Sequence, residues 1–196
     1  MSNYDFHVQA GTTFAPILKY SQPQLTVKTI TAITNSGQAV VTATSHGLTV
    51  DWPVWITSVK GMVQINSLPD DLERPARAYQ GYYVDANTMR LNLDSAAFSA
   101  YVSGGELLYH PPVDLTGYSA TMVITPLGTG ATPITLTSTP AAGITLGDAN
   151  GQISPVISAA TVAAWTWQTA KYTLNLTDGS GVVTPLASGA FIVDQV

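Results

Sequence analysis

The chain has 196 residues, of which 45% are hydrophobic and only 10% are charged, so it has the apolar content of a globular protein but far less than the roughly 25% charge of an average domain. Its net charge of −5 and its seven scattered basic residues argue against nucleic acid as the main partner, because phosphate binding needs clustered Lys and Arg. The sequence contains no cysteine, which excludes disulfides and cysteine-based zinc sites. It has no signal-peptide pattern, so we do not expect secretion. No apolar run approaches the roughly 18 residues of a membrane span, so we expect no membrane partner.

Short runs rich in Thr and Val, separated by turn residues, recur along the chain. This is the pattern of a β-sandwich or β-barrel. Within the clearest runs, apolar side chains alternate with polar ones, as on a strand with one buried face. In chain order, these runs are residues 89–93, 120–124 and 172–177.

One helix and one terminal hairpin are predicted near the C-terminus. Residues 158–165 open with Ser158, a good N-cap residue, and are rich in alanine, which predicts about two helical turns packed on the sheets. Asp-Gly-Ser-Gly at 178–181 predicts a tight turn, followed by a last strand that is broken at Gly189. Tyr172 begins a strand in a way that resembles the tyrosine corner of immunoglobulin-like sandwiches.

Residues 29–107 carry a set of short runs with a recognisable spacing. These runs are Ile-Thr-Ala-Ile at 30–33, a strand and Ser-His-Gly-Leu turn at 39–48, Val-Trp-Ile at 54–56, Gly-Met at 61–62, Gln-Ile-Asn at 64–66, Val-Asp-Ala-Asn-Thr-Met at 84–89 and Tyr-Val-Ser-Gly-Gly at 101–105. Together they resemble a small β module of phage proteins, named after the first catalytic-cysteine half-domain of ubiquitin-activating enzymes. The resemblance implies a fold and no activity, because the cysteine and a nucleotide-binding loop are missing. Residues 67–81 are longer than the usual loop of this module.

The flanking segments carry a second resemblance. Asp-Leu-Thr-Gly-Tyr at 114–118 resembles the signature of a phage β-sandwich that is similar to the N-terminal domain of upper baseplate proteins. In such proteins two strands, like residues 4–8 and 12–19 here, shortly precede the signature, and a segment like residues 171–193 ends the domain. In this chain the first strands and the signature are separated by the β module.

We therefore predict an all-β protein made of a discontinuous immunoglobulin-like β-sandwich with an inserted small β-barrel-like module. The host sandwich would comprise residues 1–25 and 110–196, and the module residues 26–109. Pro23 and the pair at 111–112 lie at the junctions, where proline stiffens the crossover.

The densest charge cluster is the candidate partner-binding site. It consists of Asp70, Asp71, Glu73, Arg74 and Arg77. A solvated loop with internal ion pairs is one interpretation, and a protein contact is another. A divalent ion is a third, although the arginines would compete for the carboxylates.

The remaining residues with chemical potential predict no catalytic, cofactor or metal site. His7, His46 and His110 lie far apart in the sequence and share no local spacing with carboxylates, so hydrogen-bonded structural histidines are expected. The run Asp-Ala-Asn-Gly at 148–151 lacks the later ligands of a calcium loop, which favours a tight turn.

Four tryptophans leave two interpretations open. Trp52 and Trp55 bracket one predicted strand, while Trp165 and Trp167 close the short helix. At least one member of each pair is expected in a core, since sandwiches need large side chains between their sheets. An exposed pair would instead form an aromatic platform for sugar binding.

These patterns predict a non-enzymatic structural component of a tailed-phage virion, in the tail, baseplate or fibre-attachment collar. Its surface holds too little charge for a free monomer, so neighbouring proteins are expected to cover it. The partners would be other virion proteins and further copies of the chain, assembled in the bacterial cytoplasm, with no cofactor. A capsid decoration or head-fibre protein and a module that binds a host glycan or receptor are the alternatives.

Overall fold

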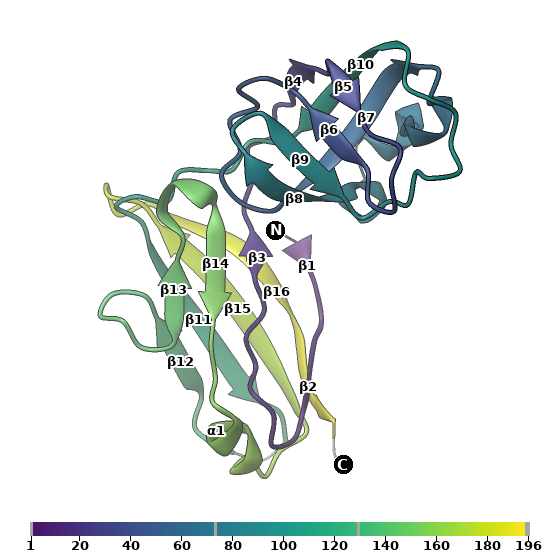
Figure 1. Ribbon diagram of the computed structural model, residues 1–196. Helices are drawn as coiled ribbons and strands as arrows, with labels where there is room; N and C mark the ends of the chain where they lie inside the picture. The colour runs from purple at the N-terminus through teal and green to yellow at the C-terminus, as the bar shows by residue number, and fades with distance from the viewer. Residues whose placement is uncertain (1, 73, 129, 195–196) are drawn as a thin grey trace. The chain divides into compact units, whose positions relative to one another are not determined.

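The computed structural model describes residues 2–72, 74–128 and 130–194, and it confirms the all-β prediction (Figure 1). The chain divides into two compact units. We call them the sandwich unit, Met1–Tyr20 with Pro112–Val196, and the barrel unit, Ser21–Pro111. The predicted boundaries, after residues 25 and 109, differ from these by five and two residues.

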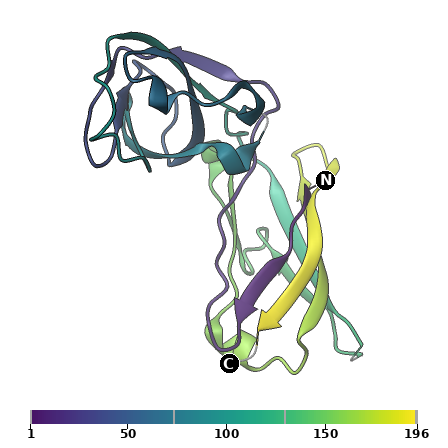
Figure 2. The same ribbon diagram turned by 90° about the vertical axis from the view of Figure 1, so that its right-hand side faces the viewer.

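The sandwich unit consists of two sheets whose packing fits the predicted sandwich. The larger has the order β1-β16-β15-β11-β12, with β2 also paired to β16, and the smaller has the order β13-β14-β3. Both β1 and β2 run parallel to β16, and Figure 2 shows β2 in purple beside β16 in yellow. The elements are β1 (Ser2–Asn3), β2 (Phe6–Gln9), β3 (Leu18–Lys19), β11 (Ser119–Pro126), β12 (Ile134–Thr137), β13 (Ile144–Leu146), η4 (Asp148–Asn150), β14 (Gln152–Pro155), α1 (Ala159–Ala163), β15 (Thr169–Thr177) and β16 (Val183–Asp194).

Alternation of side chains builds the core of this unit. On β15, Tyr172, Leu174 and Leu176 are buried, while the residues between them face outward, as the predicted period of two requires. Phe6 and Phe14 from the N-terminal segment join the same core. The core is therefore completed by residues that precede the insertion in sequence.

The Asp-Leu-Thr-Gly-Tyr run forms the turn that leads into β11. Asp114 Oδ1 accepts a hydrogen bond from the backbone N–H of Thr116, and the Tyr118 N–H donates to the Leu115 carbonyl. Leu115 is buried in the core. Gly117 has a φ of +79°, a conformation that glycine adopts without strain. The run is therefore a structural turn with an apolar anchor.

The C-terminal hairpin has the predicted turn but a longer final strand. The four residues 178–181 turn the chain from β15 into β16, and Asp178 Oδ1 accepts from the N–H groups of Ser180 and Val182. The predicted break at Gly189 is wrong, because β16 continues through it to Asp194. The glycine instead permits close approach of the Tyr4 carbonyl, which lies 2.2 Å from where a Cβ would be.

The second predicted strand, residues 12–19, is the other correction in this unit. Only Leu18 and Lys19 are strand residues, as β3, together with one bridge between Phe14 and Ile157. Pro16 has no N–H to donate, which limits ladder formation in this segment. The predicted helix is confirmed as α1, and Ser158 Oγ caps it by accepting from the Thr161 N–H.

The barrel unit is one seven-stranded sheet with the order β4-β10-β7-β8-β9-β6-β5. Its two ends meet because β4 and β5 are separated by only two residues. The Ile30 N–H donates to the carbonyl of Gly105 on β10, and the Thr31 N–H donates to the carbonyl of Thr42 on β6. The elements are β4 (Thr26–Thr29), β5 (Ala32–Ile33), β6 (Val40–Thr42), β7 (Trp52–Lys60), η1 (Val63–Ile65), η2 (Pro69–Asp71), η3 (Pro75–Arg77), β8 (Tyr79–Asp85), β9 (Thr88–Leu91) and β10 (Ser103–Tyr109).

A loop substitutes for a strand along the second half of β7. Strand β8 pairs with β7 only over residues 52–54. Beyond that point, Asn66 binds both backbone groups of Val59: its Oδ1 accepts from the N–H and its Nδ2 donates to the carbonyl. Ser67 Oγ accepts from the Ile56 N–H, and the Ser67 N–H donates to the Ile56 carbonyl. These bonds satisfy backbone groups of β7 that would otherwise lack partners.

We expect Asn66→Ala to destabilise the protein by about 2 kcal/mol, because two backbone groups of β7 lose their partners at once. Chemical denaturation followed by fluorescence measures this effect. Gln64→Ala, an exposed change in the same loop, serves as the control and is expected to stay within about 0.5 kcal/mol of the wild type. Equal stability of both variants would contradict the role of Asn66.

We expect the contribution of Asp178 to depend on pH. Hydrogen bonds from Ser180 and from the backbone hold the pKa of its carboxyl below the ordinary value. Because the pKa is lowered on folding, the stabilisation is present above the unfolded pKa, about 3.9, and is lost as the pH falls through the lower folded value. The thermal midpoints of the wild type and Asp178→Asn should therefore converge on acidification. Parallel pH profiles would contradict the prediction.

Candidate functional site

The predicted partner loop is exposed and contains two successive 3₁₀ turns. Asp71 Oδ2 accepts from the Leu68 N–H, so this carboxylate stabilises the first turn. Arg74 and Arg77 are exposed. The expected internal ion pairs are not formed by Asp70, Asp71, Arg74 and Arg77 with one another or with other described residues. The fifth predicted residue, Glu73, lies outside the described residues.

The three histidines do not converge on one site. His46 is fully buried in the barrel unit, where its Nε2 donates to the Asp85 carbonyl and its Nδ1 accepts from the Leu48 N–H. This pairing assigns the proton to Nε2. The Tyr109 hydroxyl donates to the His46 carbonyl. His46 therefore holds the Ser-His-Gly-Leu turn in place.

The other two histidines lie in different units. His7 is exposed, and its Nδ1 lies 3.3 Å from Asp194 Oδ2, a contact at which more than half of each side chain is exposed. Exposed pairs of this kind stabilise little. His110 packs edge-on against Trp55, and neither His110 Nδ1 nor Trp55 Nε1 has a hydrogen-bond partner in the described structure.

The tryptophans do not form an exposed platform. Trp52, Trp55 and Trp167 are buried, and Trp165 is half-buried and stacked on Trp167 at 4.5 Å. These rings therefore pack inside the units, as the core interpretation expected. The predicted turn at residues 148–151 is also present, with Gly151 in a left-handed conformation.

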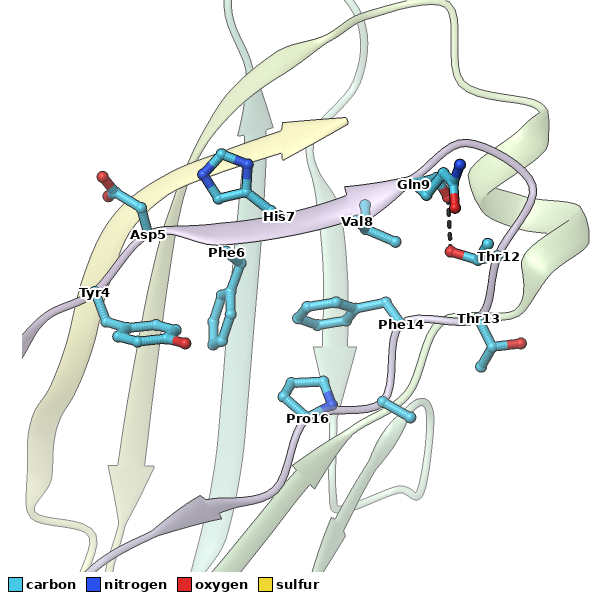
Figure 3. A pocket seen from close by; sticks show the side chains of 11 residues that line it. Tyr4, Asp5, Phe6, His7, Val8, Gln9, Thr12, Thr13, Phe14 and Pro16 are labelled. Carbon is cyan, nitrogen blue, oxygen red and sulfur yellow. Dashed lines mark hydrogen bonds between the residues drawn. The ribbon is translucent and has the colours of Figure 1, made fainter. Parts of the chain in front are cut away.

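A hollow of about 390 Å³ lies between β2 and the segment that follows it (Figure 3). Phe6, Phe14 and Pro16 gather on one side of β2, whereas Asp5 and His7 point to the other (Figure 3). The aromatic rings of the first two are largely buried and pack edge to face at 5.0 Å. Both rings are part of the hydrophobic core. The hollow therefore has an apolar floor, and no catalytic groups converge on it.

The same N-terminal segment is fastened by a tyrosine that the sequence singled out. The Tyr172 hydroxyl donates to the Tyr4 carbonyl over 2.6 Å, and Asp5 Oδ1 accepts from the Ala190 N–H. In a tyrosine corner the hydroxyl bonds a few residues upstream, whereas here the acceptor, Tyr4, lies 168 residues upstream, between β1 and β2. The pKa of Tyr172 is raised to about 12, mainly because the hydroxyl is removed from water and secondly because the negative charge of Asp5 is nearby.

The outer surface of the larger sheet is the region that the sequence reasoning did not single out. Its side chains alternate with the buried ones. We call the central part of this surface, without the exposed Asp194 at the end of β16, the threonine face. Its members are Thr121, Val123, Thr125, Thr135, Thr169, Lys171, Thr173, Ser188, Ala190 and Ile192. The sequence predicted alternation over residues 120–124 and 172–177, but it did not predict which strands are neighbours.

Charge is scarce over the whole sandwich unit. Seven of its 105 residues are charged, and the 33 residues from 115 to 147 contain none. Lys171 is the charged member of the threonine face. Beside it, a hollow of about 360 Å³ lies over β15 and β16, where the outward-facing Ser188 and Ala190 have short side chains.

No group of three or more His, Asp or Glu in the described part of the chain is arranged to hold a metal ion. Among the same residues, no helix is long and apolar enough to cross a bilayer. No protein-family model matches the chain, and no curated protein matches it either.

We expect Tyr172→Phe to loosen the N-terminal strands at a cost of about 1 kcal/mol, the loss of one hydrogen bond. Hydrogen exchange should accelerate in residues 2–9 relative to β11. Because the tyrosine pKa is raised on folding, the stabilisation is complete below the unfolded pKa, about 10, and is lost as the pH rises toward the folded value of about 12. Unchanged exchange in residues 2–9 would show that Tyr172 does not fasten this segment.

Proposed function

We propose that the chain is a non-enzymatic structural component of a tailed-phage virion, in the tail, baseplate or fibre-attachment collar. It would act by protein–protein assembly with other virion proteins and further copies of itself. The observation that carries this proposal is the scarcity of charge on the sandwich unit, with seven charged residues in 105. A free domain needs surface charge to stay soluble, whereas a domain covered by neighbours does not.

The resemblance to phage proteins is the reason for proposing a phage virion as the assembly. The run 114–118, which is similar to the upper-baseplate signature, forms the turn that anchors Leu115 in the core. The segment 171–193, which is similar to the end of such a domain, forms most of the hairpin on which the N-terminal strands pair. These residues therefore have clear structural roles in this chain, and the resemblance rests on them.

The division into two units suggests a division of labour. Each unit has its own buried core, so the inserted barrel unit can provide a separate contact surface without interrupting the sandwich. The exposed Arg74 and Arg77 on its loop would suit an acidic partner, since both guanidinium groups lack ion-pair partners among the described residues. Symmetric repetition would multiply weak contacts of this kind.

We expect the chain in purified, nuclease-treated phage particles, at a few to a few tens of copies relative to the major capsid protein. Quantitative mass spectrometry measures this ratio. An abundant host cytoplasmic protein followed through the same purification controls for carry-over. Hundreds of copies would place the chain on the capsid instead, and its absence would overturn the structural role.

A further inference from the structure

We propose that the threonine face binds the threonine face of a second copy of this chain, about a twofold axis that runs parallel to the strands. The inference rests on the proposed assembly role and identifies one partner and one surface for it. Two features support the inference. The first is the relief of the face, meaning which strands carry projecting side chains and which carry short ones. The second is the position of its charged residue.

The relief is set by the register of the strands. Val123 of β11 lies between Thr135 and Thr173, and Thr173 lies beside Ser188. Branched side chains project outward from β11 and β12, and we call them the ridge. The short side chains of β16 leave the hollow beside β15. Ridge and hollow therefore lie in the same rows of the sheet, on opposite sides of the line between β15 and β11.

A twofold axis along that line seats each ridge in the hollow of the other copy. Because the rows are preserved by this rotation, Thr173 meets the second copy's Val123, and Ser188 meets its Thr135. An interface with this symmetry must be self-complementary. The paired ridge and hollow satisfy that requirement twice.

The single cation of the face agrees with the same axis. Lys171 lies in one row with Thr125 of β11. The rotation therefore sets the ammonium group against the second copy's Thr125, whose hydroxyl can accept a hydrogen bond, and keeps the two lysines apart. No like charges meet directly, because the two ammonium groups lie on opposite sides of the axis.

The area of the face sets the strength of the contact. Three strands with about eight residues each and the four residues of β12, spaced about 4.8 Å apart, give a patch of about 450 Å² per copy. The total of about 900 Å² lies in the range of weak, transient complexes. Association is therefore weak in solution and depends on concentration, and repetition in a particle would strengthen it.

Sedimentation velocity of the full chain, from low micromolar to about 1 mM, tests the proposal. We expect a reversible dimer. Ser188→Arg in the hollow and Thr135→Asp on the ridge should each weaken association at least about tenfold, because each buries an unpaired charge. An equimolar mixture of the two should dimerise again, since the arginine then faces the aspartate and the other ridge and hollow are unchanged.

Thr145→Arg is the matched control, because Thr145 is exposed on β13 of the smaller sheet. It should dimerise like the wild type, and circular dichroism should show the same fold for every variant. A monomeric wild type, unaffected dimers of Ser188→Arg, or a mixture that stays monomeric would each overturn the inference. A chain that is monomeric in solution yet present in particles would overturn this inference alone, whereas a dimer absent from particles would overturn the proposed function.

Discussion

The sandwich unit depends on the pairing of β16 with two partners that come from opposite ends of the sequence. On one side β15 reaches β16 through the five residues 178–182. On the other side β1 and β2 reach it across the whole chain. Closing such a distance costs entropy that only a large gain in packing offsets. Phe6 and Phe14 provide this gain because they enter the core directly.

Details around Gly189 follow from that pairing. A side chain at this position would collide with the Tyr4 carbonyl, and the carbonyl must lie there to accept from Tyr172. Asp5 then binds the Ala190 N–H with its side chain. The neighbours of Gly189 in the strand, Ser188 and Ala190, face outward and line the hollow on the outer face.

The two units solve the problem of unpaired strand edges differently. The barrel unit brings its sheet ends together at residues 30–31 and covers the rest of β7 with Asn66 and Ser67. The sandwich unit keeps short outer strands, a common protection against uncontrolled pairing. Its larger open surface is therefore a sheet face, where shape and charge decide what binds. In the assembly that we propose, this difference would make the sandwich the main contact element and the barrel unit a separate contact surface.

The sequence by itself determined the elements whose cause is local. Alternation predicted β11 and β15, Ser158 predicted the start of α1, and the residues at 178–181 predicted the last hairpin turn, because these signals act within a few residues. Only the tertiary structure decided that β16 runs unbroken through Gly189, that Tyr172 bonds Tyr4, and that residues of β11, β15 and β16 share one face. Each of these depends on which distant strand becomes the neighbour, and a period of two in one strand carries no information about its partner.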